Sequence, residues 1–401
     1  MSDTFCLSPN EKVGIEMIGK KYPSEMKEYI DQKTGKVVKQ LTSNGSNNFH
    51  FYFTDNSFTL GDKEIYFLSD RSSPIPRIYN LFKMDLETGE MIQMTDEPEG
   101  IAPSFHTKPP ESDIIVYVTG RLLKKLDVTT METSVLYEER PGIKLGHPHI
   151  SADKKYVGMA RNESVEIERG ANYKGFKESM FAIKKGWITL ISLDGKQAFD
   201  VFEDTHQLGH FQFSPIHNSL ATFCHEGPWN LVQQRIWLLD IRARSVEPVY
   251  RQEEDDCIGH EFWTNDGKIF FDNRRKGHDG TITVHKTQAT IQVKPETKQV
   301  PFVGFTDENG KLSRKIDVPY YCNHYHSNRD NTLLVGDDVE DLVLIDISGK
   351  TASIQTLCSH HTSWNNQQTH CHPTFSWNNE KILFASDREG VCNLYLVDVP
   401  K

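Results

Sequence analysis

Long hydrophobic runs are missing from this chain of 401 residues, whose mean hydropathy is -0.55. No stretch approaches the roughly 18 consecutive apolar residues that a transmembrane helix needs, so we expect no membrane partner. Residues 1–20 carry acidic side chains and no apolar core segment. This start predicts that a secretory signal is absent.

Cysteine is also scarce, with 7 residues, an odd number, and no C-x-x-C spacing. This usage predicts reduced thiols in a cytoplasmic protein. Basic residues are in the minority, since 45 Lys and Arg stand against 56 Asp and Glu and the net charge is -11. Such a charge argues against a nucleic-acid partner. An anionic ligand would need a locally positive pocket.

The chain has no Pro-, Gly- or Ser-rich linker, no shift in composition and almost no amphipathic helical pattern. We therefore expect residues 1–401 to form a single domain. What the chain does have is a repeated pair of strand-like runs, in seven units at the spacing of roughly 40 to 65 residues that suits propeller blades. The paired runs are Glu64–Asp70 with Leu81–Asp85, Ile114–Val118 with Lys124–Asp127, Tyr156–Ala160 with Trp187–Leu193, Leu220–Cys224 with Arg235–Asp240, Lys268–Asp272 with Thr281–Val284, Thr332–Gly336 with Leu342–Asp346, and Lys381–Asp387 with Leu394–Asp398.

The last unit shows only two strong strands before Lys401, so we expect its outer strand to come from elsewhere. Residues 36–42, which follow the turn Thr34-Gly35, have the alternation of a strand that could close the ring. The sequence therefore predicts an all-β fold, a seven-bladed β-propeller closed by its own N-terminal strand. A large β-sandwich or two smaller β domains are the alternatives.

Histidines recur at equivalent places in five of these units, shortly before the strongest strand, where the innermost strand is expected. They are His50, His210, His260, His324 and the pair His370 and His372. Propellers carry their functional groups around the central axis, so these units direct imidazoles towards one channel. A structural role is usual for one buried histidine and improbable for five in register.

The segment His370–His372 places two imidazoles on one face of an extended strand, because side chains alternate with period two. The nearby amide of Gln367 and a second pair, His324 and His326, could complete a divalent metal site. Such ligands suit Mn, Fe, Ni or Zn, and the set differs from a structural zinc site because it includes glutamine and no cysteine pair.

An open metal site of this kind indicates chemistry on an anionic substrate. A metal on a carboxylate stabilises the enediolate that forms when the neighbouring proton is removed. Arg235, at the head of a strand, could add a second positive group, and a free histidine could act as general base.

Several motifs in the second half of the chain occur together in one family. They are Cys224–Pro228, Arg235–Trp237, His260–Trp263, His324 with Ser327-Asn328, Gly336-Asp337, Thr362–Trp364, the cluster of Gln367, His370 and His372, and Ser386–Gly390. On these motifs the chain resembles the oligogalacturonate lyases, polysaccharide lyase family twenty-two. The match is dense from about Gly209 onwards and thinner before it, where His50–Phe53 and Asp85–Gly89 carry it.

The resemblance implies a cytoplasmic enzyme with a manganese ion on the propeller axis. It places the metal ligands at His324, Gln367, His370 and His372, the catalytic base at His260, and an arginine that assists at the substrate carboxylate at Arg235. The expected reaction is β-elimination of short oligogalacturonides such as digalacturonate, giving a 4,5-unsaturated uronate that rearranges to a keto sugar. By position alone, we also expect contacts to sugar from His210, His225, His50 and His326.

Some segments depart from the family pattern. Cys371 stands where proline is expected, and residues 161–177, 185–206 and 274–317 match poorly. Because these segments could form the rim of the pocket, a lyase or an epimerase acting on another uronate oligosaccharide stays open. So does a non-catalytic propeller that binds partners, and the choice between monomer and dimer.

Overall fold

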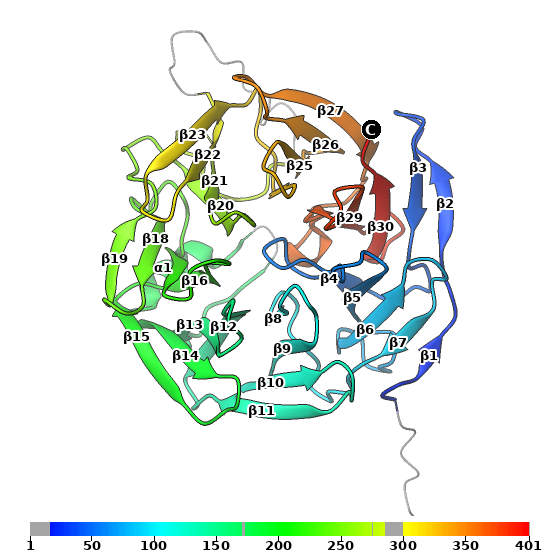
Figure 1. Ribbon diagram of the computed structural model, residues 1–401, viewed down its shortest axis with the longest axis horizontal. Helices are drawn as coiled ribbons and strands as arrows, with labels where there is room; N and C mark the ends of the chain where they lie inside the picture. The colour runs from blue at the N-terminus through cyan, green and yellow to red at the C-terminus, as the bar shows by residue number, and fades with distance from the viewer. Residues whose placement is uncertain (1–16, 171–172, 275, 285–299, 401) are drawn as a thin grey trace, which may run out of the picture.

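The computed structural model describes residues 17–170, 173–274, 276–284 and 300–400, which form seven antiparallel sheets arranged as the blades of a ring (Figure 1). The strands of each blade follow one another from the axis outwards. Blade 1 holds β4 (Asn48–His50), β5 (Glu64–Ser69), β6 (Asn80–Asp85), β7 (Met91–Gln93) and β1 (Lys21–Tyr22). Blade 2 holds β8 (His106–Thr107), β9 (Ile114–Thr119), β10 (Leu122–Asp127) and β11 (Thr133–Glu138). Blade 3 holds β12 (Ile143–Ile150), β13 (Tyr156–Glu163), β14 (Gly186–Ser192) and β15 (Ala198–Asp204).

The second half of the chain continues in the same order around the ring. Blade 4 holds β16 (Leu208–Phe213), β17 (Leu220–His225), β18 (Ile236–Asp240) and β19 (Ser245–Pro248). Blade 5 holds β20 (Ile258–Trp263), β21 (Ile269–Asn273), β22 (Phe302–Thr306) and β23 (Leu312–Asp317). Blade 6 holds β24 (Tyr325–Ser327), β25 (Leu333–Asp337), β26 (Asp341–Asp346) and β27 (Ser353–Ser359). Blade 7 holds β28 (Thr374–Phe375), β29 (Lys381–Ser386), β30 (Asn393–Asp398), β3 (Val37–Gln40) and β2 (Lys27–Ile30).

The second strands of several blades are strongly apolar because both of their faces are covered. In β5, β9 and β29, five of six residues are buried, so the strand reads as a continuous apolar run instead of an alternating one. The blade edges carry the polar residues, as in the exposed first half of β11. This pattern is the reason that the paired runs are visible in the sequence.

The ring is closed by the N-terminal segment, as predicted. Strand β3 pairs antiparallel with β30, with Val38 opposite Val397, so the first and last parts of the chain share blade 7. Strand β2 adds a further edge strand outside β3, which the sequence did not indicate. The seven-bladed propeller is therefore confirmed, and its treatment as a single domain stays a prediction.

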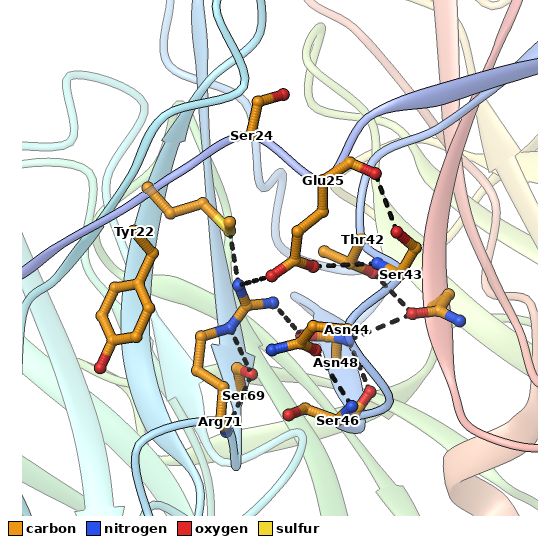
Figure 2. A network of polar contacts seen from close by, with 12 residues as sticks. Tyr22, Ser24, Glu25, Thr42, Ser43, Asn44, Ser46, Asn48, Ser69 and Arg71 are labelled. Carbon is orange, nitrogen blue, oxygen red and sulfur yellow. Dashed lines mark hydrogen bonds and ion pairs between the residues drawn. The ribbon is translucent and has the colours of Figure 1, made fainter.

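A buried arginine holds the N-terminal segment where it passes from blade 1 to blade 7 (Figure 2). The guanidinium of Arg71 donates to Glu25 Oε1 at 2.8 Å, to Asn48 Oδ1 at 2.8 Å and to Ser69 Oγ at 2.9 Å. The Arg71 side chain is fully buried. Removing one partner of such a buried pair costs roughly 3–5 kcal/mol, so this contact contributes strongly to closure of the ring.

One predicted strand is wrong. Residues 281–284 form no strand, and β21 pairs instead with β22, Phe302–Thr306. The backbone N–H of Thr283 donates to the side chain of Asn323 at 2.9 Å, so a side chain satisfies this backbone group where a ladder was expected. The long segment 274–317 therefore contains an insertion between β21 and β22 and then the two outer strands of blade 5. Residues 275 and 285–299 of that segment lie outside the described residues.

Helices are a minor feature of the described chain. The helix α1 (Phe176–Ala182) lies between β13 and β14, and the short 3-10 helix η1 (Gln367–Thr369) precedes β28. Within the described ranges, no helix has the length and apolar character needed to cross a membrane.

Candidate functional site

Backbone irregularities aim several histidines of the innermost strands. In β20 the register shifts between Gly259 and Phe262, and His260 within this bulge has a φ of 47°. His210 in the bulge of β16 has a φ of 49°, and His372 just before β28 has a φ of 44°. Left-handed backbone is uncommon for residues other than glycine, and bulges redirect side chains beside active sites. The local backbone, and not the regular alternation of a strand, therefore sets the direction of these three imidazoles.

Three histidines of blades 6 and 7 come together at one point. One nitrogen each of His324, His370 and His372 lies within 4.8 Å of the other two. His324 directly precedes β24, and His370 ends η1. His324 and His370 are each 2 % exposed, so the group is enclosed by protein. This arrangement brings together three of the four predicted metal ligands.

The protonation of these imidazoles suits a metal. Burial first, and then the neighbouring charges and histidines, lower the pKa of His324, His370 and His372 well below the ordinary value, so the rings are neutral. Asp337 Oδ2 accepts from His324 Nδ1 at 2.8 Å, which leaves the other nitrogen of that ring as a lone-pair donor.

Two further nitrogens of this group are buried without a partner. His370 Nδ1 and His372 Nε2 have no hydrogen bond among the described residues. Buried polar atoms are nearly always satisfied in native proteins, so such orphans indicate an ion or a ligand. The donor set therefore fits a divalent transition metal.

Gln367, the fourth predicted ligand, is the first residue of η1. Its backbone carbonyl accepts from the N–H of His370 at 3.5 Å, so the turn of η1 brings the two residues together. Burial raises the pKa of Tyr173, and the nearby Gln367 side chain opposes part of that rise. Gln367 is exposed, unlike the three histidines.

His260 of blade 5 lies beside this group, with its ring centroid 5.1 Å from that of His324. Its Nδ1–H donates to Asp272 Oδ1 at 3.1 Å, which fixes the tautomer and leaves Nε2 as the basic nitrogen. Burial, followed by the charges of Arg274 and Arg235, lowers the pKa of His260 well below its ordinary value. The neutral ring is therefore ready to accept a proton.

Trp229 links the base to two arginines. Its ring lies 5.0 Å from that of His260, and the guanidinium carbons of Arg235 and Arg274 lie 5.6 Å and 4.8 Å from its centroid. A Cβ at Gly259 would come within 1.9 Å of the Trp229 ring, so glycine is required there. Both arginines are buried, at 3 % and 2 % exposure. They place two buried cations beside His260.

Arg235 and His210 share a carboxylate. Both terminal nitrogens of Arg235 lie 3.4 Å from Glu226 Oε2, and His210 Nε2 lies 3.3 Å from Glu226 Oε1. On its other side, His210 Nδ1 lies 3.7 Å from the buried carboxylate of Glu261. The nitrogen Nε of Arg235 and both oxygens of Glu261 have no hydrogen-bond partner in the described chain. His210 and Arg235 are thus part of one polar cluster next to His260.

His225 lies to one side of that cluster. Its Nε2 is 3.2 Å from Asp204 Oδ2, and its ring stacks on His206 with centroids 4.2 Å apart.

The other two histidines that were expected at the sugar make backbone contacts. His50 Nε2 donates to the carbonyl of Cys371 at 3.0 Å, and the N–H of Phe375 donates to His326 Nδ1 at 3.2 Å. Neither belongs to the group formed by His324, His370 and His372. Cys371 itself is fully buried in the core.

The structure adds residues that the motifs did not reveal. Asp272 lies near the end of β21, 12 residues after His260. Asp337 is the last residue of β25, 13 residues after His324. An acidic residue at this repeated offset is a signal that the sequence contains. Tyr52 lies against His372, with ring centroids 5.0 Å apart, and gives no comparable signal.

The fold and the site together define a β-propeller enzyme with a metal centre among its innermost strands. Residues 17–401 match the family model described as oligogalacturonate lyase, so the chain belongs to the oligogalacturonate lyase family. It is 26% identical over 408 residues to the oligogalacturonide lyase of Pectobacterium atrosepticum, covering 95% of this chain and 98% of that one. The oligogalacturonate lyase of Dickeya dadantii is 26% identical over 409 residues, with the same coverage of both chains.

Solved structures agree with this assignment. An oligogalacturonate lyase in complex with manganese superposes with a TM-score of 0.82 at 25% identity, over 96% of this chain and 98% of that one. The oligogalacturonate lyase of Vibrio parahaemolyticus gives a TM-score of 0.83 at 25% identity, over 96% and 99%. The resemblance drawn from the motifs is therefore confirmed.

Proposed function

We propose that the protein cleaves short oligogalacturonides, such as digalacturonate, by metal-assisted β-elimination. The products are a shortened uronide and a 4,5-unsaturated uronate that rearranges to a keto sugar. Family membership over the whole described chain supports this reaction. The observation that carries it is the convergence of three neutral imidazoles within 4.8 Å, beside a fourth imidazole supported by an aspartate.

The ion that we assign to this centre is Mn²⁺, held by His324, Gln367, His370 and His372. The solved relative that contains manganese supports this choice. When bound, the ion withdraws charge from a uronate carboxylate and makes the adjacent C–H bond more acidic. The three histidines contribute no charge of their own, so the positive charge of the ion remains available to the substrate.

The protein groups around the centre have complementary roles in this proposal. Arg235 binds the substrate carboxylate, exchanging its 3.4 Å contact with Glu226 for a charge-assisted hydrogen bond to the sugar. His260 Nε2 removes the C5 proton, because its Nδ1–H is held by Asp272. The electrons of the C5–H bond then form the C4–C5 double bond, and the C4–O bond breaks with its electrons passing to the glycosidic oxygen, which takes a proton from water.

We also propose that the enzyme works in the cytoplasm on oligosaccharides already cut to a short length. The six cysteines among the described residues are all free and buried, which agrees with a reducing compartment.

The test is to incubate manganese-loaded protein with digalacturonate and trigalacturonate and to follow the absorbance of the unsaturated uronate. Because that product rearranges, a colour assay for keto sugars is run on the same samples. We expect product from the wild type and none after EDTA treatment or in His260→Ala. A protein that holds its metal and yet makes no product from either sugar would contradict the galacturonate assignment.

A further inference from the structure

Two neighbouring blades carry the same backbone irregularity. In β16 of blade 4 and in β20 of blade 5, the register of the innermost strand shifts after a glycine, at Gly209 and at Gly259. The next residue in each strand is a histidine with left-handed backbone, His210 with a φ of 49° and His260 with a φ of 47°. The two imidazoles are therefore held at equivalent positions of adjacent blades.

The residue paired with the glycine differs between the two blades. In blade 5 it is Asp272, which lies opposite Gly259 and accepts from His260 Nδ1 at 3.1 Å. In blade 4 it is Cys224, which lies opposite Gly209. The histidine of blade 4 therefore lacks the aspartate that fixes the tautomer of the base.

Two carboxylates lie on either side of His210 instead. Glu226 Oε1 is 3.3 Å from Nε2, and Glu261 Oε1 is 3.7 Å from Nδ1. Burial raises the pKa of Glu226, but the charges of Arg235 and then His210 lower it overall, so this carboxyl is ionised. Glu261 is fully buried, and a buried carboxylate without hydrogen bonds needs a positive charge beside it. Because negative charge on both sides of an imidazole favours its protonated form, the surroundings of His210 suit a proton donor.

His210 lies at the edge of the candidate centre and is open to a ligand. The ring of Tyr52 lies between it and the metal group, with centroids 6.0 Å from His210 and 5.0 Å from His372. The His210 side chain is 21% exposed, against 10% for His260. A sugar that reaches the base can therefore also reach the imidazole of His210.

The elimination needs a proton donor other than its base. In galacturonate the C5–H and C4–O bonds point to opposite faces of the sugar ring, so His260 cannot serve both. Negative charge develops on the glycosidic oxygen as the C4–O bond breaks, and a positioned donor lowers the cost of that charge. Arg235 and Arg274 do not give up protons, and both nitrogens of His147 are already engaged in hydrogen bonds. His210 has the accessible imidazole and the carboxylates that the role requires.

We propose that His210 is a further catalytic residue, whose Nε2–H donates a hydrogen bond and then its proton to the glycosidic oxygen that leaves C4. The role rests on the proposed function. In the balanced step, His260 takes the C5 proton, the C5–H electrons form the C4–C5 double bond, and the C4–O electrons pass to the leaving oxygen. That oxygen bonds the proton of His210, whose N–H electrons stay on the ring as a lone pair. Water then returns a proton to His210 and removes one from His260, so the overall reaction still takes its proton from water.

The experiment compares two leaving groups in His210→Asn, since asparagine tolerates left-handed backbone and cannot supply the proton. Digalacturonate releases a sugar hydroxyl, which needs a proton, whereas a galacturonate with fluorine at C4 releases fluoride, which needs none. We expect kcat on digalacturonate to fall about 10²- to 10⁴-fold, the usual contribution of a general acid, while fluoride release stays near the wild-type rate. His217→Asn, the same exchange at an exposed histidine just after β16, is the matched control and should leave both rates unchanged.

A second variant keeps the imidazole and changes its surroundings. Glu261→Gln removes the carboxylate beside His210 Nδ1, so it should lower kcat on digalacturonate, by less than His210→Asn does, and should leave fluoride release unchanged. Circular dichroism and EPR titration of Mn²⁺ should give wild-type folding and metal affinity for both variants.

Equal activity of His210→Asn and wild type on digalacturonate would overturn the role of His210 and leave the proposed function intact. Equal losses on both leaving groups would also overturn it, because His210 would then bind the sugar without supplying the proton. A wild type that forms no product from digalacturonate would refute the proposed function itself.

Discussion

The sequence His-Pro occurs twice near the propeller axis, at His147-Pro148 in blade 3 and at His372-Pro373 in blade 7, and the two histidines have opposite surroundings. His147 uses both ring nitrogens as donors, to the carbonyl of Ser104 and to Asp55 Oδ2 at 2.8 Å. His372 has a buried Nε2 without a partner among the described residues and lies 4.2 Å from the ring of His324.

The ionisation of the two rings follows from these contacts. Burial alone would lower the pKa of His147, but the hydrogen bond and the charge of Asp55 raise it above its ordinary value. Burial and the neighbouring histidines lower the pKa of His372 well below that value. Both ring nitrogens of His147 are therefore engaged as donors and leave no lone pair, whereas the ring of His372 is neutral and keeps one. An axial histidine thus marks a metal centre only where hydrogen-bond acceptors do not already occupy both of its ring nitrogens.

The largest expected difference is in metal binding. His372→Asn should remove a ligand of the ion, because asparagine is too short to reach it. Loss of a residue that only hydrogen-bonds to a ligand costs up to about 100-fold in metal affinity, so this variant should weaken Mn²⁺ binding by more than that. His147→Asn keeps a donor for Asp55 and should bind Mn²⁺ as the wild type does. EPR titration of free Mn²⁺ measures both affinities, with circular dichroism to confirm folding. Equal losses in the two variants would remove the distinction between the two histidines.

The second prediction separates the base from the ligands. His260→Ala should lower kcat on digalacturonate by about 10²- to 10⁴-fold, the usual contribution of a general base, with Mn²⁺ affinity close to that of the wild type. The reason is that His260 lies beside the group of three histidines without belonging to it. A large loss of metal in this variant would place His260 among the ligands.

The third prediction uses two aspartates that support different histidines. Asp337→Asn should weaken Mn²⁺ binding about 10- to 100-fold, since Asp337 orients His324. Asp272→Asn should leave Mn²⁺ binding unchanged and lower kcat, because it supports His260. Mn²⁺ affinity and kcat are measured on both variants, and only Asp337→Asn should lose affinity. Similar losses of affinity in the two variants would contradict this division of roles.

The smallest expected effect concerns Asp55 and the pH dependence of stability. Burial raises the pKa of Asp55, but the hydrogen bond and charge of His147 outweigh burial and lower it from the usual 3.8 to about 2. A carboxyl with a lowered folded pKa adds stability above its unfolded pKa and loses it as the pH falls towards the folded value. The contribution is about 2 kcal/mol, present at pH 5 and above and lost between about pH 4 and 2.

Urea unfolding of wild type and Asp55→Asn from pH 6 downwards checks this sign. The difference in free energy of unfolding should shrink as the pH falls. The matched control is Asp398→Asn, at a side chain that is 80% exposed, and its difference should not change. A constant difference for Asp55→Asn would mean that the ion pair with His147 is absent.

Much of the fold was predictable because blade packing leaves a periodic trace. Second strands such as β5 and β29 are covered on both faces, so paired apolar runs revealed the seven units, and the alternation of residues 36–42 revealed the closing strand. The wrong strand prediction at Thr281–Val284 has a local cause. These β-branched residues lie in an insertion, where the side chain of Asn323 accepts the hydrogen bond from the Thr283 N–H. Sequence alone does not show which β-branched run enters a ladder.

The site was predictable where its residues follow each other closely, as in His370–His372. The histidines at equivalent places of the blades also connected His324 and His260 with that pair, but no sequence signal pointed to Tyr52, which packs on His372. His147-Pro148-His149 has the same spacing as His370–His372, so spacing by itself does not separate the two pairs. The difference between them depends on Asp55, which lies in another blade.

The most direct test of the account is an anomalous difference map from crystals of the manganese-soaked protein, recorded at the manganese absorption edge. We predict a peak bounded by His324, His370 and His372, with the amide of Gln367 at its open side. A peak beside His147 and Asp55, or none at the three histidines of blades 6 and 7, would contradict it.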